Sequence, residues 1–323
     1  MKKNRLLVVL LAAAVSLSVF SACGKSEQST SEQINSSVQT ESEVHTETAE
    51  QPDIYRFEDY ECDEVFDIQK IALNEQLEQK CVSYKFTYLS DGYKIKAYIA
   101  IPKSAIESQT PQKCIMYNRG GNSQIGQLQD DTVAILCGMF NYTIVATQYR
   151  GAGGSEGSDQ FGGDDLHDVI KLIDLCENNF SFIDMTDFCI ACTSRGGVMT
   201  YPAARQDNRI KRIVAVSALS DAISGYEERD DMKEVMVNYI GCTPEENPEE
   251  YKKRSVIYWA DEITIPVLII HSKEDKKVSY KQAQQLYEKL EKHGNCTFIS
   301  HDDDLHGLNP DDIPKVLEWL ENT

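Results

Sequence analysis

The segment CTSRGG, residues 192–197, decides how the fold is interpreted, because it places a serine between an apolar run and two glycines. The run DFCIAC, residues 187–192, has the continuous apolar character of a strand that is buried on both faces. Two glycines then follow Ser194 where a helix must begin close to the strand. In this strand, turn and helix context the serine of a G-x-S-x-G pattern becomes a nucleophile, although Cys192 replaces the first glycine here. The context predicts a catalytic Ser194 rather than an ordinary loop hydroxyl.

Similar apolar runs recur along the chain and alternate with helical periods. Apolar positions spaced as in a helix occupy residues 166–173 and 283–290. An alternating segment at 94–101 follows the turn at 90–92 and predicts an antiparallel hairpin at the edge of the sheet. Buried strands that alternate with amphipathic helices predict an α/β fold with a mostly parallel sheet covered by helices on both faces. The other apolar runs are residues 114–118, 142–149, 210–218, 266–272 and 296–301.

One interval, residues 219–262, is too long for an ordinary connection between two such elements. It is either a small helical cap over the site or a disordered insertion. Met232, Val235, Met236 and Tyr239 recur at helical spacing and favour the cap.

The first 23 residues have the order of a secretory signal. Positive charges at Lys2, Lys3 and Arg5 precede an apolar segment, and small residues lead to Cys23. The pattern resembles a bacterial lipoprotein signal, which implies a lipid on Cys23 and an extracytoplasmic protein anchored to the cell membrane. An uncleaved anchor is the alternative.

Residues 24–64 are predicted to form a disordered acidic tether. They hold 12 acidic residues against Lys25 and Arg56, and residues 24–53 have almost no large apolar side chains to bury. Residues 65–323 are long enough for one domain. The whole chain carries a formal charge of −20, which argues against nucleic acid as a partner because phosphate binding needs clustered Lys and Arg.

The ten cysteines give no sign of a metal or redox site. Nine remain after Cys23, an odd number, and the one C-x-x-C spacing, Cys189 and Cys192, falls within the apolar run 187–192, where a free cysteine behaves as a small hydrophobe. A disulfide such as Cys62–Cys81 is compatible with a location outside the cytoplasm, but the spacing does not determine the pairing. Neither a metal nor a cofactor is implied.

A nucleophilic serine needs a base, and the chain offers six histidines. His306, in DLHGL, lies in a loop after the last predicted strand and is followed by a glycine. It fits the chain order Ser, acid, His, and Gly307 leaves room for its ring to reach across, so it is favoured over His301, the structural competitor. The others are interpreted as tether, solvated helix or packed strand positions: His45, His167, His271 and His293.

The acid that orients this base is predicted in HSKEDKKV, just beyond the run 266–272. Asp275 stands in a loop at the carboxyl end of that strand, with Glu274 as its immediate rival. The run Asp302–Asp304 is interpreted as a solvated loop or helix cap because it lacks calcium-loop spacing.

Taken together, these segments resemble an α/β-hydrolase, and within it the catalytic domain of the prolyl oligopeptidase family of serine peptidases. The resemblance spans about residues 84–310. Its further features are YLSDGYKIKAYIAIP, YNRGGN, QYRGAGGSEG and NPEEYKKRSV.

The resemblance implies a catalytic triad of Ser194, His306 and Asp275. It also implies an oxyanion hole formed by the backbone N–H of Arg195 and that of Gly121, in the loop where Arg119, Gly120 and Gly121 stand at the family's His-Gly-Gly. Considered alone, Arg119 and Arg150 are expected to make salt bridges within their loops.

Three functions remain open. The resemblance favours a peptidase acting on peptide substrates without the large propeller of many relatives. A carboxylesterase of small acyl esters uses the same machinery, and a catalytically inactive, tethered binding protein could share the fold.

Overall fold

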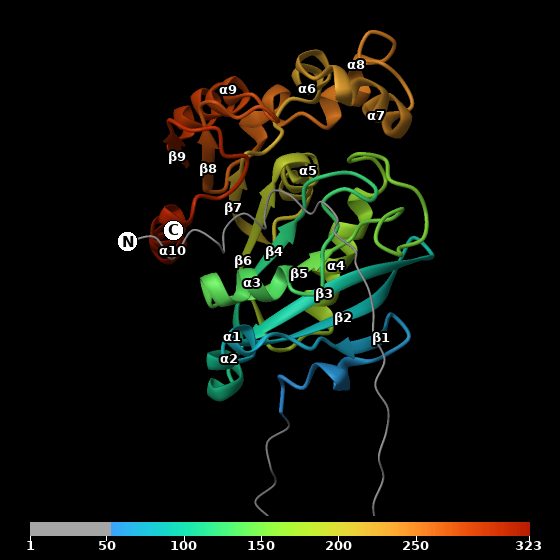
Figure 1. Ribbon diagram of the computed structural model, residues 1–323, viewed down its shortest axis with the longest axis vertical. Coiled ribbons are helices and arrows are strands. Elements are labelled where there is room, and N and C mark those ends of the chain that lie inside the picture. The colour runs from blue at the N-terminus through green and yellow to red at the C-terminus, as the bar shows by residue number, and fades with distance from the viewer. Residues whose placement is uncertain (1–52) are drawn as a thin grey trace, which may run out of the picture. The chain divides into compact units, whose positions relative to one another are not determined.

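A mixed sheet of nine strands organises residues 53–323, which are the residues that the computed structural model describes (Figure 1). The strand order is β1-β2-β3-β5-β4-β6-β7-β8-β9. Strands β1, β2, β3 and β5 pair antiparallel in turn, and all the pairs from β5 to β9 are parallel. The strands are β1 (Val65–Lys70), β2 (Cys81–Ser90), β3 (Tyr93–Pro102), β4 (Gln112–Asn118), β5 (Thr143–Thr147), β6 (Ile183–Thr193), β7 (Ile210–Val216), β8 (Val267–Ser272) and β9 (Cys296–His301).

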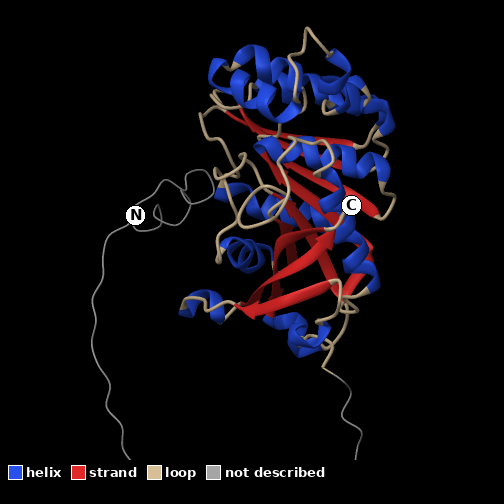
Figure 2. Cartoon of the chain, turned by 90° about the vertical axis from the view of Figure 1, so that its right-hand side faces the viewer, coloured by secondary structure: helices blue, strands red, loops and turns tan. Residues whose placement is uncertain are grey.

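Helices enclose the sheet on both faces, as Figure 2 shows. One apolar core joins the sheet to α4, α5 and α9, and a second core joins the opposite face to α3 and α10. The helices are α1 (Glu75–Glu78), α2 (Lys103–Ser108), α3 (Thr132–Phe140), α4 (Leu166–Asn178), α5 (Gly197–Gln206), α6 (Ala222–Glu228), α7 (Asp230–Ile240), α8 (Pro248–Lys253), α9 (Tyr280–Leu290) and α10 (Ile313–Asn322).

The two cores explain why the central strands are continuously apolar. In β4, Met116 belongs to the first core and Ile115 to the second, and in β6 the neighbours Ile190 and Cys189 divide in the same way. Because successive side chains of a strand point to opposite faces, a strand buried on both sides needs apolar residues at every position. The predicted α/β class, with a mostly parallel sheet, is confirmed.

The prediction that the hairpin forms the edge of the sheet is wrong. The hairpin is β2 and β3, but β1 pairs outside β2 and forms the edge. Strand β1 gives little sequence signal because its pairing with β2 is irregular between Phe66 and Gln69, and Asp67 takes a positive φ of 54°. Such a bulge breaks the alternation on which strand prediction depends.

The predicted boundary of the tether at residue 64 is also wrong. Tyr55 and Phe57 are buried, and the Phe57 ring packs edge-on against Phe86 and Phe180, with centroid distances of 5.3 and 5.1 Å. The acidic residues around these aromatic side chains hid the contribution of the segment to the core. The predicted signal segment, Cys23 and residues 24–52 lie outside the described residues.

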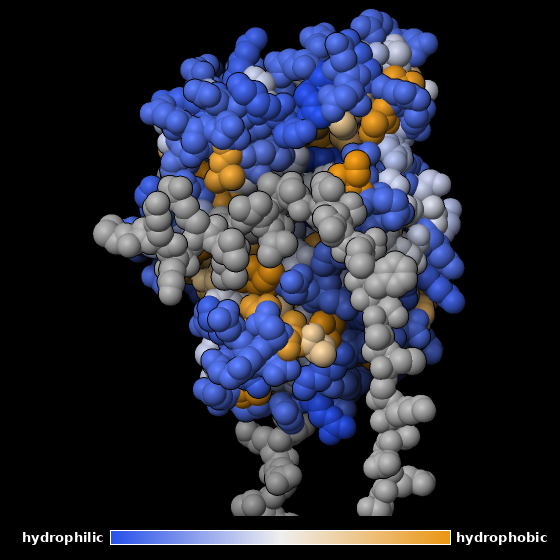
Figure 3. Space-filling view, viewed as in Figure 1, coloured by the Kyte–Doolittle hydropathy of each residue, from blue (hydrophilic) through white to orange (hydrophobic). Residues whose placement is uncertain are grey.

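The long interval 219–262 contains α6, α7 and α8, which Figure 1 shows at one end of the domain. On the face shown in Figure 3, the described residues expose mostly hydrophilic side chains with small apolar patches. None of the helices in residues 53–323 has the length and apolar character needed to span a membrane.

Candidate active site

Ser194 lies at the sharp turn between β6 and α5. The turn is one 3₁₀ segment, Ser194–Gly196, and Ser194 itself has a φ of +56°. A non-glycine residue in this left-handed region costs about 1 to 3 kcal/mol, and such residues cluster at functional sites. The Leu219 N–H, just after β7, donates to the Ser194 carbonyl at 2.9 Å and holds the turn.

Close backbone packing explains the two glycines that follow the serine. A Cβ atom at Gly196 would lie 2.3 Å from the Asn118 carbonyl oxygen, at the end of β4, and 3.0 Å from the Cβ of Cys192. A Cβ atom at Gly197 would lie 2.3 Å from the Leu219 carbonyl oxygen. Because Cys192 already fills its side of the turn, the position opposite it must be glycine.

Asp275 and His306 meet although they are 31 residues apart. His306 Nδ1 lies 2.8 Å from Asp275 Oδ2, and the Asp275 side chain is completely buried. The backbone N–H groups of Lys277 and Val278 donate to the other carboxylate oxygen at 2.7 and 3.2 Å. The acid is therefore fixed by its own loop and presents one oxygen to the imidazole.

A second imidazole, which the sequence interpretation did not connect with the acid, also contacts Asp275. His271 Nε2 lies 3.4 Å from Asp275 Oδ2 and 2.9 Å from the Val278 carbonyl oxygen. Burial raises the pKa of Asp275, but hydrogen bonds from His271 and His306 outweigh it and hold the pKa well below its usual range. Asp275 is therefore ionised at neutral pH. The packed, hydrogen-bonded His271 predicted from the sequence is confirmed.

The rivals considered from the sequence lie elsewhere. Glu274 is exposed. His301 pairs with Asp312, with Nε2 and Oδ2 2.5 Å apart, and so does not contact Asp275. His167 and His293 are exposed and lie beside Asp91 and Asp261. In the acidic run, Asp302 pairs with Lys273 and Asp303 accepts the Leu305 N–H.

The serine and the histidine loop are held at neighbouring strand ends. Ser194 follows β6 and Ser217 follows β7, the adjacent parallel strand. The Ser217 hydroxyl accepts the Gly307 N–H at 3.2 Å, which ties the residue after His306 to this edge. Within residues 53–323 no hydrogen bond joins the Ser194 hydroxyl to His306, a contact that in unliganded enzymes often tightens only when substrate binds.

The loop after β4 approaches the serine closely. A Cβ atom at Gly120 would lie 3.0 Å from the Ser194 Cβ, and Gly121 has a φ of +70°. Arg119 at the start of the loop is buried, and its guanidinium donates to the carbonyls of Gln148 at 2.9 Å and Gly120 at 3.1 Å. Burial beside Arg195 lowers the pKa of Arg119 to about 10.

Of the two predicted loop salt bridges, only one forms. Arg150 pairs with Asp168 at 2.7 Å and with Asp91 at 2.8 Å. Arg119 makes no ion pair within the described part of the chain and is held by backbone carbonyls instead. The salt bridge predicted for Arg150 forms, but its partners lie in α4 and in the turn between β2 and β3 rather than in its own loop, and the prediction for Arg119 is wrong.

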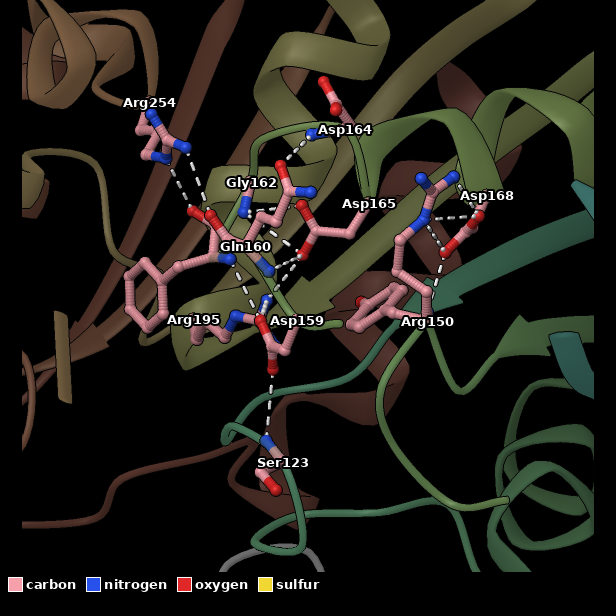
Figure 4. Close-up of polar contacts among 12 residues, drawn as sticks. Ser123, Arg150, Asp159, Gln160, Gly162, Asp164, Asp165, Asp168, Arg195 and Arg254 are labelled. Carbon is pink, nitrogen blue, oxygen red and sulfur yellow. Dashed lines mark hydrogen bonds and ion pairs between the residues drawn. The ribbon is translucent and has the colours of Figure 1, made fainter. Parts of the chain in front are cut away.

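The sequence interpretation missed a buried cluster of charges beside the serine turn. The Arg195 side chain, used in that interpretation only for its backbone N–H, pairs with Asp159 at 2.6 Å and with Asp165 at 2.9 Å (Figure 4). Both carboxylates come from the loop between β5 and α4, where no periodic pattern marks them as buried. Only the density of charge and glycine in residues 150–165 could have pointed to a structured loop.

An apolar pocket lies between the sheet and helices α3 and α10. Its lining includes Thr193 and Leu308, which adjoin the site in sequence, but not Ser194, Asp275 or His306. The pocket is therefore not where the reacting groups meet. No group of three or more metal-binding side chains occurs among residues 53–323.

A strained serine at a strand-to-helix turn, with a histidine held by a buried aspartate in loops after other strands of the same sheet, is the arrangement of the α/β-hydrolases. The sequence pattern of the prolyl oligopeptidase family matches residues 130–321. The chain belongs to this family, as the sequence resemblance implied, and is a serine hydrolase.

Two curated relatives come from Bacillus subtilis (strain 168). The chain is 30% identical over 245 residues to the uncharacterized peptidase YtmA, in a match that covers 74% of this chain and 93% of that relative. It is 29% identical over 143 residues to the uncharacterized peptidase YuxL, covering 42% of this chain and 21% of that relative.

Solved structures share the fold at lower identity. An acylaminoacyl peptidase in complex with Z-Gly-Gly-Phe-chloromethyl ketone superposes with a TM-score of 0.65 at 22% identity, covering 76% of this chain and 42% of that one. A puromycin-hydrolyzing peptidase of Mycobacterium tuberculosis gives 0.61 at 21% identity, covering 77% and 39%. This chain thus spans less than half of either solved chain.

Proposed function

We propose that this chain is a peptidase that cleaves acyl bonds through a covalent acyl-enzyme on Ser194. The observation that carries the proposal is the 2.8 Å contact between His306 and the buried Asp275, at the sheet edge where Ser194 stands in its left-handed turn. A hydroxyl is a weak nucleophile until a base accepts its proton, and the base must be held by a third group.

In the proposed reaction, Ser194 Oγ attacks the substrate carbonyl carbon while its proton passes to His306 Nε2. Asp275 accepts the Nδ1–H of the same ring, which fixes the tautomer and stabilises the imidazolium that forms. His306 then gives the proton to the leaving amine as the scissile bond breaks. Water, activated by the same imidazole, hydrolyses the ester that remains on Ser194 and restores the enzyme.

The negative charge on the tetrahedral intermediate needs hydrogen-bond donors. We assign these to the backbone N–H groups of Arg195 and Gly121. The assignment is supported by the close approach of the Gly120 backbone to Ser194 and by the position of Arg195 directly after the nucleophile. Loss of one such donor typically lowers kcat by about 100-fold to 1,000-fold.

The choice of peptides over esters rests on family membership and on the relatives, several of which are named as peptidases. A carboxylesterase is the second candidate, because the same groups cleave esters. In either case α6, α7 and α8 are proposed to act as the cap that limits substrate size.

A fluorophosphonate probe tests the nucleophile directly. Wild-type protein should be labelled, and Ser194→Ala should not. Equal labelling of the two proteins would contradict the proposed mechanism. It would favour the third alternative, a catalytically inactive binding protein. Matched amide and ester substrates then separate the two hydrolases, since turnover of the ester alone would contradict the peptidase assignment.

The membrane anchor is a separate proposal. A lipid on Cys23 would hold the enzyme outside the cytoplasm at the bacterial membrane. The test is incorporation of an alkyne-tagged fatty acid by cells that express the full chain, with Cys23→Ala as the control. Equal incorporation in both proteins would contradict the anchor.

A further inference from the structure

The Arg195 side chain is not directed to solvent, although it follows the proposed nucleophile in a turn. It is 4% exposed, and its two terminal nitrogens contact three groups. Nη2 donates to Asp159 Oδ1 at 2.6 Å and to Asp165 Oδ2 at 2.9 Å, and Nη1 donates to Asp159 Oδ2 at 3.1 Å. Nη1 also lies 3.2 Å from the carbonyl oxygen of Gly121, which it holds by a further hydrogen bond.

Asp159 makes a second contact with the loop after β4, which contains Gly121. The Ser123 N–H donates to Asp159 Oδ2 at 3.1 Å, as Figure 4 shows. The Asp159–Arg195 pair therefore holds the loop after β4 at two points, one through each member. Gly121, Ser123 and Gly126 in this loop all have positive φ values, of 70°, 47° and 69°. The Asp159–Arg195 pair therefore supports a loop with an irregular backbone.

We propose that the Asp159–Arg195 ion pair positions the oxyanion hole. It fixes the peptide group between residues 121 and 122, which directly follows the Gly121 N–H, relative to Arg195, so that the two N–H donors face the same oxygen. This inference rests on the proposed function, because it needs an oxyanion at Ser194. Asp159 and the Arg195 side chain act through the loop and do not touch the substrate, so they are positioning residues.

Both carboxylate oxygens of Asp159 are occupied by hydrogen bonds. Each oxygen accepts two N–H groups, one from Arg195 and one from the backbone of Ser123 or Phe161. In Asp159→Asn, an NH₂ group replaces one of the two carboxylate oxygens. An NH₂ group cannot accept hydrogen bonds, so the two N–H donors that face it lose their acceptor. Arg195 keeps its second partner, Asp165, and the buried charge stays compensated in the variant.

The cap segment anchors the loop that carries Asp159. Arg254, directly after α8, donates from Nε to the Phe161 carbonyl at 3.0 Å and from Nη2 to the Gln160 carbonyl at 3.1 Å. The position of Asp159 is thus set by buried contacts on both sides of the loop.

The experiment compares Asp159→Asn with Asp164→Asn. Asp164 is a solvent-exposed neighbour in the same loop. Its variant removes the same charge but keeps the contacts of Asp159 with Arg195 and Ser123. We measure kcat and KM on a substrate that the wild type hydrolyses, and the affinity for a peptide aldehyde, whose hemiacetal with Ser194 places an oxyanion in the hole. Active sites are counted with the fluorophosphonate, so that unfolded protein does not enter kcat.

Asp159→Asn should lower kcat per active site by about 10-fold to 100-fold with KM within about twofold, and should weaken the aldehyde by a similar factor, since a displaced donor acts mainly on the oxyanion. Asp164→Asn should match the wild type. Arg195→Lys, which keeps the charge beside Asp165 but loses the two-pronged contact, should show the same pattern as Asp159→Asn and serves if that variant does not fold.

Wild-type kcat and aldehyde affinity in both positioning variants would overturn the inference. So would a fall in thermal stability with kcat per active site unchanged, because that result describes a purely structural ion pair. Failure of the proposed function is distinguishable from either result, since then the wild type itself is not labelled at Ser194.

Discussion

Two histidine–aspartate pairs lie close together in the sequence near the C-terminus, and only one has the surroundings of a catalytic base. In the pair His306–Asp275 the nitrogen and oxygen are 2.8 Å apart, and in His301–Asp312 they are 2.5 Å apart. Both aspartate side chains are fully buried, and the histidine side chains are 19% and 21% exposed. Neither distance nor burial separates the two pairs.

The difference lies in which nitrogen is used and which element supplies the acid. His306 contacts its aspartate through Nδ1, which keeps Nε2 available for the proposed proton transfer from Ser194, whereas His301 uses Nε2. Asp275 lies in the loop after β8, but Asp312 lies at the N-cap of α10, where Lys315 also pairs with it at 3.0 Å. A short contact between imidazole and carboxylate is therefore weak evidence of catalysis until its place in the fold is known.

The sharpest way to break this comparison is to remove each histidine in turn. His306→Ala should lower kcat by about 10⁴-fold to 10⁶-fold, as the loss of a triad base does. His301→Ala should leave kcat unchanged, because the His301 ring contacts Asp312 at the N-terminus of α10. Initial rates on an activated ester, corrected for folded protein, measure both. The reverse result would move the base to His301.

The acids give the next largest effect. Asp275→Asn should lower kcat by about 10⁴-fold, because the amide favours the wrong imidazole tautomer. The control is Glu274→Gln, which changes the exposed neighbour and should leave kcat unchanged. Equal losses in the two variants would mean that bulk charge, rather than the contact with His306, explains the effect.

Removal of Asp312 should affect stability rather than chemistry. Asp312→Ala leaves His301 and Lys315 without their buried partner and should lower the free energy of unfolding by about 3 kcal/mol. Urea unfolding measures this, with exposed Asp311→Ala as the matched control. A large loss of kcat per labelled active site in Asp312→Ala would show that the two pairs do not have separate tasks.

The low pKa of Asp275 makes its contribution to stability depend on pH. An aspartate whose folded pKa lies below its unfolded value of about 4 stabilises the fold above that value, and the stabilisation is lost as the pH falls through the folded pKa. The wild type should exceed Asp275→Asn in unfolding free energy by an amount, of the order of 2 kcal/mol, that shrinks as the pH drops below about 4. A difference that stays constant from pH 7 to pH 2.5 would contradict the depressed pKa.

The smallest effect is expected at His271, whose Nε2 lies 3.4 Å from Asp275 Oδ2. His271→Phe removes a hydrogen bond and should lower kcat by about fivefold to tenfold, the value of about 1 kcal/mol. His271→Gln, whose amide can donate to the same acceptors, should recover part of the loss. If His271→Phe has wild-type kcat, the second imidazole only fills space.

The sequence predicts those parts of the fold that depend on local pattern. Periodicity located α4 and α9. Continuous apolar runs located β4 to β8, which are buried on both faces, and also the partly exposed edge strand β9. Strand β1 was missed because its bulge breaks the alternation. The core contribution of Tyr55 and Phe57 was missed because partners far along the chain bury them.

At the site, the sequence predicts residues whose role follows from chain order but not those held by the fold. Asp275 and His306 were located by their loops after strands, and they do come together. The contact of His271 with Asp275 depends on how the loop after β8 folds back. The burial of Asp159 and Asp165 depends on Arg195, which is at least 30 residues away along the chain.

The buried thiol two positions before Ser194 has a practical consequence for chemical labelling. Burial raises the pKa of Cys192 to about 12, so at neutral pH it is almost entirely protonated and unreactive toward maleimides and iodoacetamide. Among residues 53–323, Cys62 is the one exposed free cysteine, whereas Cys242 and Cys296 are half-buried and the others are buried. A fluorophore can therefore be attached at Cys62 while the serine turn remains unmodified, which would allow binding to be followed in an otherwise unaltered enzyme.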